Sequence, residues 1–260
     1  MFEFRQNEKI LYPWLSISKR NDTIVFTTKK IGSRFFEEIT KTDINSKFNS
    51  IDVRFENAHS DNQNFDNKLH IKGKHISNVG SKNTLTTSEF FTNFNVESFS
   101  DFFSIDYFKN NKIYIIIRNP YTRFYTGFFE KIDSIAVGEY TSEYLKTEPQ
   151  DSIDSILNKY ANNADYRYLS DEHMSMWNTF IYEFLHTYKL EKYVNVIDLG
   201  DSEKMNSTFG YLEQPTNRPY LDLWLENPNN KEYIDTLHTN LDYYFDLEMK
   251  YYNKLLNLNK

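Results

Sequence analysis

A run of isoleucines that ends in an arginine constrains this chain more than any other segment. Ile113, Ile115, Ile116 and Ile117 form an apolar, β-branched run of the kind found in the central strands of parallel sheets. Asn119 can cap a following helix, and Pro120 suits its first turn. Aromatic and apolar residues then recur with helical spacing at Tyr121, Phe124, Tyr125, Phe128, Phe129 and Ile132. The segment predicts a buried strand, a short loop and an amphipathic helix.

The same arrangement occurs earlier in the chain. The segment 23–28 reads as a buried strand, residues 30–33 as a turn, and Phe35, Phe36 and Ile39 lie on one helical face. Later residues predict a helix around 177–185, a strand at 194–199 and one long helix over 231–256. Residues 40–110 are polar and carry less pattern. Alternating strands and helices predict an α/β fold, with a single domain over residues 1–260 and a central, mostly parallel sheet flanked by helices.

Composition narrows the classes of function. The net charge of −7 argues against a general nucleic-acid binder, which would be basic. The absence of cysteine excludes disulfides, thiolate zinc sites and cysteine nucleophiles. No apolar run approaches the length of about 20 residues that a membrane-spanning helix needs, and the N-terminus has no signal-peptide pattern. We therefore expect a cytoplasmic protein without a membrane span, and the 22 Phe and 20 Tyr predict a core rich in ring packing.

The first chemical motif is the segment Thr27-Thr28-Lys29-Lys30-Ile31-Gly32-Ser33-Arg34, between the first predicted strand and its helix. Ligands of open parallel sheets bind at the carboxyl ends of strands, and a helix N-terminus offers free N–H groups to an anion. Gly32 lets the backbone approach that anion closely. The segment lacks the G-x-x-x-x-G-K-[ST] pattern of a Walker A loop. The alternative interpretation is an ordinary turn with exposed lysines.

The second motif begins at Arg118, where the isoleucine strand ends. A charge at the end of a buried strand is costly without a partner, so Arg118 indicates an anionic partner there. Thr126 lies two helical turns further on, on a different face from the aromatic residues, and could add a hydroxyl to a phosphate clamp. The alternative is an arginine that pairs with a carboxylate in the core.

Together the two motifs resemble those of the sulfotransferases that use 3′-phosphoadenosine-5′-phosphosulfate (PAPS), in particular the carbohydrate (heparan- and chondroitin-like) type. Lys30-Ile31-Gly32-Ser33-Arg34 resembles the element that binds the 5′-phosphosulfate. Arg118, Asn119, Pro120, Arg123, Thr126 and Phe128 resemble the element that binds the 3′-phosphate. Their order and their separation, 88 positions from Lys30 to Arg118, strengthen the resemblance. It implies a P-loop-like sulfotransferase fold.

The resemblance also implies roles for individual residues. Lys30 would stabilise charge on the bridging oxygen, Ser33 and the amides from Ile31 to Arg34 would hold the 5′-phosphate, and Arg118 with Thr126 would hold the 3′-phosphate. The acceptor would be a carbohydrate or another small molecule, the product would be adenosine 3′,5′-bisphosphate (PAP), and no metal is required.

An acceptor hydroxyl needs a general base. His75 is the first candidate, and Glu56 and His59 are the next. His173 reads as a substrate or structural contact, whereas His186 and His238 read as helix-surface residues.

Two other functions stay open at this point. One is a glycan-binding protein without catalytic activity on the same fold. The other is a kinase-like enzyme that uses ATP, although Arg118 and Thr126 have no evident role in it.

Overall fold

The structure of the protein is a computed structural model that describes residues 14–28, 30–32, 36, 49–54, 91–92, 94–136, 176–210 and 226–258. Its elements, in chain order, are β1 (Trp14–Arg20), β2 (Thr23–Thr27), β3 (Asn49–Arg54), α3 (Phe99–Phe102), α4 (Ile105–Lys109), β4 (Lys112–Ile117), α5 (Pro120–Ala136), α7 (Trp177–Tyr188), η5 (Glu191–Tyr193), β5 (Val194–Asp198), α8 (Ser202–Phe209), η6 (Pro228–Asn230), α10 (Lys231–Asn240) and α11 (Asp242–Leu256). The α/β class predicted from the sequence is confirmed.

The five described strands form one sheet in the order β3-β1-β2-β4-β5. β2 pairs in parallel with β4, and β4 pairs in parallel with β5. β1 pairs antiparallel with both β2 and β3. The prediction of a mostly parallel sheet is therefore wrong, because the sheet is mixed and only the β2-β4-β5 part is parallel. β1 is not predicted from the sequence, because Ser16 and Ser18 alternate with apolar residues there and are nevertheless buried.

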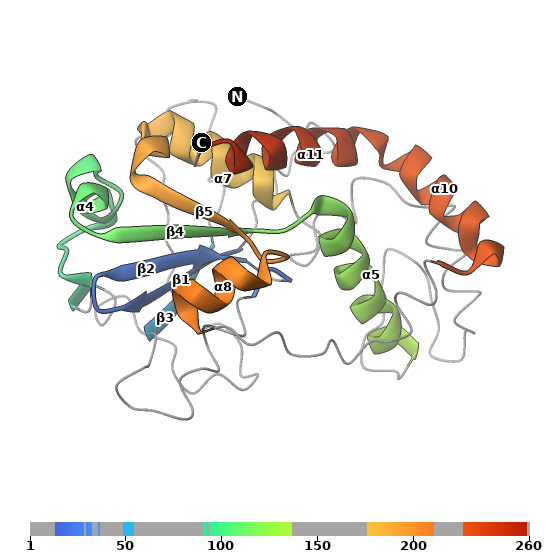
Figure 1. The fold of residues 1–260 in the computed structure, drawn as a ribbon, viewed down its shortest axis with the longest axis horizontal. Coiled ribbons are helices and arrows are strands. Elements are labelled where there is room, and N and C mark those ends of the chain that lie inside the picture. The colour runs from blue at the N-terminus through green and yellow to red at the C-terminus, as the bar shows by residue number, and fades with distance from the viewer. Residues whose placement is uncertain are drawn as a thin grey trace.

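Helices cover both faces of the parallel part of the sheet (Figure 1). On one face, the side chains of Phe26, Ile115 and Ile117 pack with α4, α7 and α11. On the other face, Val25, Ile116 and Ile197 pack with Phe36 and with α8. Because both faces are covered, β2 and β4 must be apolar on both sides, which explains their continuous β-branched and aromatic runs.

Aromatic rings fill much of the core, as the composition predicts. The ring of Phe26 lies 6.0 Å from that of Phe102, 6.4 Å from that of Phe103 and 5.9 Å from that of Phe108, measured between centroids. Such tilted and edge-on contacts add to the free energy gained by burial. They attach the short helices α3 and α4 to β2.

α5 begins as the sequence predicts. The side chain of Asn119 accepts hydrogen bonds from the N–H groups of Tyr121 (3.0 Å) and Thr122 (3.3 Å), and Pro120 occupies the first helical position. The aromatic face of α5 packs against α11, where the rings of Tyr121 and Phe245 stack at 4.5 Å. This packing fixes the direction in which α5 leaves the sheet (Figure 1).

The C-terminal segment forms two helices, so the single helix predicted over 231–256 is wrong. α10 ends at Asn240 and α11 starts at Asp242. Between them, Leu241 leaves the helical conformation (φ −121°, ψ 21°) while its side chain stays completely buried. The apolar spacing continues across this break, so periodicity alone does not reveal it.

We expect Ile115→Ala to lower the free energy of unfolding by about 2–5 kcal/mol, because Ile115 is fully buried in the central strand. Ile105→Ala is the matched control: Ile105 is 36% exposed, and its loss should stay below about 1 kcal/mol. Urea unfolding followed by circular dichroism measures both. Equal losses would contradict the central position of β4 in the core.

Candidate functional site at the carboxyl ends of β2 and β4

The two sequence motifs meet at one edge of the sheet. β2 and β4 run in parallel, with Phe26 beside Ile115, so their carboxyl ends lie side by side. β5 ends at the same edge, with Asp198 beside Ile117. The loops that follow β2, β4 and β5 therefore converge, which is the usual position of a ligand site in an open parallel sheet.

We use the name Lys30 loop for Thr28, Lys30, Ile31 and Gly32, which follow β2. The N–H of Ile31 donates to the carbonyl of Thr28 (3.3 Å), and the N–H of Phe36 donates to the carbonyl of Gly32 (3.5 Å). Lys30 has φ +65° and Gly32 has φ +89°. A left-handed conformation is unusual for lysine and costs about 1–2 kcal/mol. Such strain clusters at functional sites.

The Lys30 loop also packs against the loop that follows β5. A Cβ atom placed on Gly32 would lie 3.2 Å from Cδ1 of Leu199. Glycine therefore serves two purposes at this position: it adopts the positive φ, and it leaves room for Leu199.

Arg118 connects the two motifs directly. Its Nη1 donates a hydrogen bond of 2.9 Å to the carbonyl oxygen of Lys30, across 88 residues of sequence. The carbonyl of Arg118 in turn accepts a hydrogen bond of 3.3 Å from Nδ2 of Asn178, on α7. Lys30, Ile31, Gly32 and Arg118 are thus brought together, as the sequence motifs predict.

Two further polar groups lie at the end of β2. Thr27 and Thr28 are completely buried, and neither hydroxyl oxygen has a hydrogen-bond partner among the described residues. An unsatisfied buried hydroxyl costs about 1–3 kcal/mol, so each such group calls for an explanation. Three other buried polar atoms also lack a partner among the described residues: Oδ1 of Asn178, Oγ1 of Thr179 and the hydroxyl of Tyr244. Thr27 and Thr28 both belong to the first sequence motif, but no role is predicted for them there. Two consecutive hydroxyl residues at the end of an apolar strand were the available signal.

Thr126 lies in the second turn of α5, and its side chain is only partly buried. Its hydroxyl donates to the carbonyl of Thr122 (2.6 Å), a common local bond for threonine in a helix. Thr126 would need to break this bond in order to donate to a phosphate. The position of Thr126 on a face other than the aromatic one is confirmed by the burial of Phe124, Tyr125 and Phe128.

Arg123, the second arginine of the motif, is fully buried, and so is Glu248 of α11. Burial raises the pKa of the Glu248 carboxyl, and the positive charge of Arg123 and the N–H groups of Thr179 and Asn178 oppose that rise. Arg123, rather than Arg118, is thus the arginine of this motif whose charge acts on a carboxyl group of the core.

His238 differs from its prediction as a helix-surface residue. Its Nε2 lies 2.8 Å from the hydroxyl of Tyr125, and its ring lies 5.0 Å from that of Phe245. Desolvation lowers the pKa of His238, and nearby Asp235 opposes this. His186 does lie on the surface, where its Nδ1 is 2.7 Å from Glu191.

Several predicted site residues fall outside the part of the chain that the structure describes. They are Ser33, Arg34, Glu56, His59, His75 and His173. Within the described ranges, no group of three or more His, Asp and Glu residues is placed to hold a metal ion. None of the described helices is long and apolar enough to cross a membrane.

A shallow hollow of about 560 Å³ lies elsewhere, along η6 and α10. It is lined by residues that include Asn229, Asp235 and Thr239, and it contains none of the predicted site residues. We assign no function to it.

Compared with protein-family models, with curated proteins and with solved structures, the chain matches none of them.

Gly32→Ala should lower the free energy of unfolding by about 1–2 kcal/mol through its positive φ, and further through the contact with Leu199. Gly210→Ala is the matched control, because Gly210 has φ +72° but no atom of the described residues lies within 4 Å of the position that its Cβ would take. Urea unfolding compares the two variants. A smaller loss for Gly32→Ala than for Gly210→Ala would contradict the packing of the Lys30 loop on Leu199.

Proposed function

We propose that this protein is a sulfotransferase that moves a sulfuryl group from PAPS to a hydroxyl or amine, with a carbohydrate as the favoured acceptor. The observation that carries the proposal is the hydrogen bond between Arg118 and the carbonyl of Lys30. It unites, at one edge of the sheet, the two segments that resemble the 5′-phosphosulfate and 3′-phosphate elements of PAPS-dependent enzymes.

The groups at this edge suit an anionic nucleotide. Lys30 and Arg118 bring positive charge, and the glycine-containing loop brings the backbone close to a ligand. The buried hydroxyls of Thr27 and Thr28 are donors that lack acceptors among the described residues. Phosphate and sulfate oxygens are acceptors, so a nucleotide for which the Lys30 loop opens would supply the acceptors that these fully buried hydroxyls lack.

The chemistry is an in-line displacement at sulfur. The bond between sulfur and the bridging oxygen of the 5′-phosphate breaks, a bond to the acceptor oxygen or nitrogen forms, and a base takes the acceptor proton. As in phosphoryl transfer, the protein contributes mainly positioning and charge stabilisation.

The residues would divide this work between them. Lys30 would stabilise negative charge on the bridging oxygen, with Ser33 and the amides from Ile31 to Arg34 around the 5′-phosphate. Arg118 and Thr126 would hold the 3′-phosphate. For this, the Thr126 hydroxyl must break its hydrogen bond to the carbonyl of Thr122. His75 is the first candidate for the base, followed by Glu56 and His59.

Nucleotide binding tests the proposal most directly. At a hundred times its dissociation constant, PAP should raise the free energy of unfolding by about 2.7 kcal/mol. AMP and ATP at the same concentration should raise it less, because neither carries a 3′-phosphate. Thermal denaturation with each nucleotide measures the difference. A larger shift with ATP would favour a kinase-like enzyme, and no shift with PAP would contradict the proposed cofactor.

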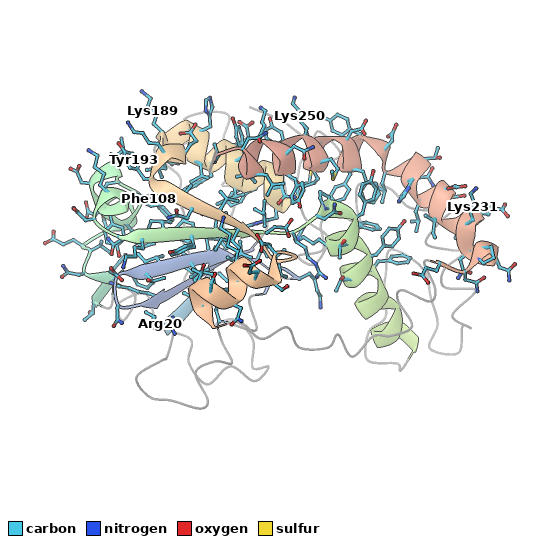
Figure 2. All side chains as sticks on the ribbon, in the orientation of Figure 1. Arg20, Phe108, Lys189, Tyr193, Lys231 and Lys250 are labelled. Carbon is cyan, nitrogen blue, oxygen red and sulfur yellow. The ribbon has the colours of Figure 1, made fainter. Side chains whose placement is uncertain are left out.

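Lys30→Met should reduce sulfuryl transfer from PAPS by at least about 100-fold, because it removes the charge at the leaving oxygen. The matched control is Lys189→Met: Lys189 shares the left-handed backbone (φ +57°) but lies at the outer end of α7, away from the site (Figure 2). Transfer of radiolabelled sulfate to a panel of oligosaccharides measures both variants. If PAP binds but wild type transfers no sulfate to any acceptor, a glycan-binding role is favoured instead.

A further inference from the structure

We propose that Asn178 is a positioning residue for Arg118, and that the buried carboxylate of Glu248 holds Asn178 in place for this role. The inference rests on the proposed function, since it concerns how the 3′-phosphate is distinguished. It extends the site from the sheet edge into the interface between α7 and α11.

The first turn of α7 contacts the end of β4 twice. Nε1 of Trp177 donates to the carbonyl of Ile116 (3.0 Å), and Nδ2 of Asn178 donates to the carbonyl of Arg118 (3.3 Å). Both side chains are completely buried. Ile116 belongs to the strand, but Arg118 lies between β4 and α5, beyond the described ladder bonds of β4. A bond to its carbonyl therefore restrains a backbone segment that the sheet does not hold.

Glu248 fixes this turn from a different helix. Met176 stands at the N-cap of α7 and cannot accept a hydrogen bond there through its side chain, and the first turn carries no acidic residue. Instead, Oε2 of Glu248 accepts from the N–H of Asn178 (3.1 Å), and Oε1 accepts from the N–H of Thr179 (2.8 Å). A carboxylate at a helix N-terminus satisfies free N–H groups and interacts favourably with the helix dipole.

The two bonds of Asn178 work together. Its backbone is held by Glu248, and its side chain holds the carbonyl of Arg118, whose guanidinium reaches the Lys30 loop. The positive charge of Arg123, on α5, opposes the rise in the pKa of Glu248 that burial causes. Small displacements of a binding group cost affinity steeply, so sites depend on such supporting bonds. Loss of the Asn178 amide should therefore weaken binding of the 3′-phosphate more than that of the 5′-phosphate.

The test compares Asn178→Ala with Thr179→Ala. Both variants truncate a buried side chain in the same turn, and both keep the backbone N–H that binds Glu248. The readout is the ratio of the dissociation constants of AMP and PAP, measured by calorimetric titration. We expect Asn178→Ala to lower this ratio by about tenfold, and Thr179→Ala to leave it within about twofold of wild type.

Asn178→Asp decides the matter if the alanine variant does not fold. It keeps the shape of the side chain and suits a helix N-terminus, but it replaces the donor with an acceptor facing the Arg118 carbonyl. Asn178→Asp should lower the ratio of the AMP and PAP dissociation constants at least as much as Asn178→Ala does.

An unchanged ratio in the Asn178 variants, or an equal fall in Thr179→Ala, would overturn the positioning role. Wild type without any preference for PAP over AMP would instead contradict the proposed function itself. The two failures are therefore distinguishable.

Discussion

The arrangement around the site depends on one buried carboxylate, that of Glu248. It accepts hydrogen bonds from two N–H groups of α7, so it joins α11 to α7 directly, and the buried charge of Arg123 on α5 opposes the rise of its pKa. Removing the Glu248 side chain would leave these two buried N–H groups without their acceptors, and each unsatisfied buried group costs about 1–3 kcal/mol. Because α5 and α7 both begin near the end of β4, the same network sets the geometry at the sheet edge (Figure 1).

That edge combines features that are individually unfavourable for stability. Lys30 adopts a left-handed conformation, and the hydroxyls of Thr27 and Thr28 are buried without partners in the described part of the chain. Folding alone does not require any of these. The proposed site for an anionic ligand would account for them together, because the strained loop would present its backbone and a ligand would supply the acceptors that the hydroxyls lack. The surrounding core of fully buried isoleucine and phenylalanine side chains provides the free energy that sustains this strain.

The errors of the sequence analysis share a physical origin. β1 was missed because Ser16 and Ser18 are small polar residues that neighbouring elements bury, and such burial is set by tertiary contacts. The break at Leu241 was missed because buried apolar residues continue with helical spacing across it, from Leu237 of α10 to Tyr244 and Phe245 of α11. His238 was placed on the surface because its spacing fits an exposed position, whereas α5 brings Tyr125 to it. Each error concerns a feature that the spacing of residues along the sequence does not reveal.

The sequence by itself determined the α/β class, the parallel pair of strands, the start of α5 at Asn119 and the candidate residues Lys30, Gly32 and Arg118. These follow from local patterns: β-branched runs, a helix cap, a glycine at a turn and a charge at a strand end. Only the tertiary structure decided that Arg118 reaches the Lys30 loop while Arg123 turns inward to Glu248. Both are arginines in one short motif, and the carboxyl group on which the charge of Arg123 acts lies more than 100 residues away in the chain. The spacing of residues along the sequence does not show that Arg123 and Glu248 come near each other, because the packing of helices from distant parts of the chain decides this.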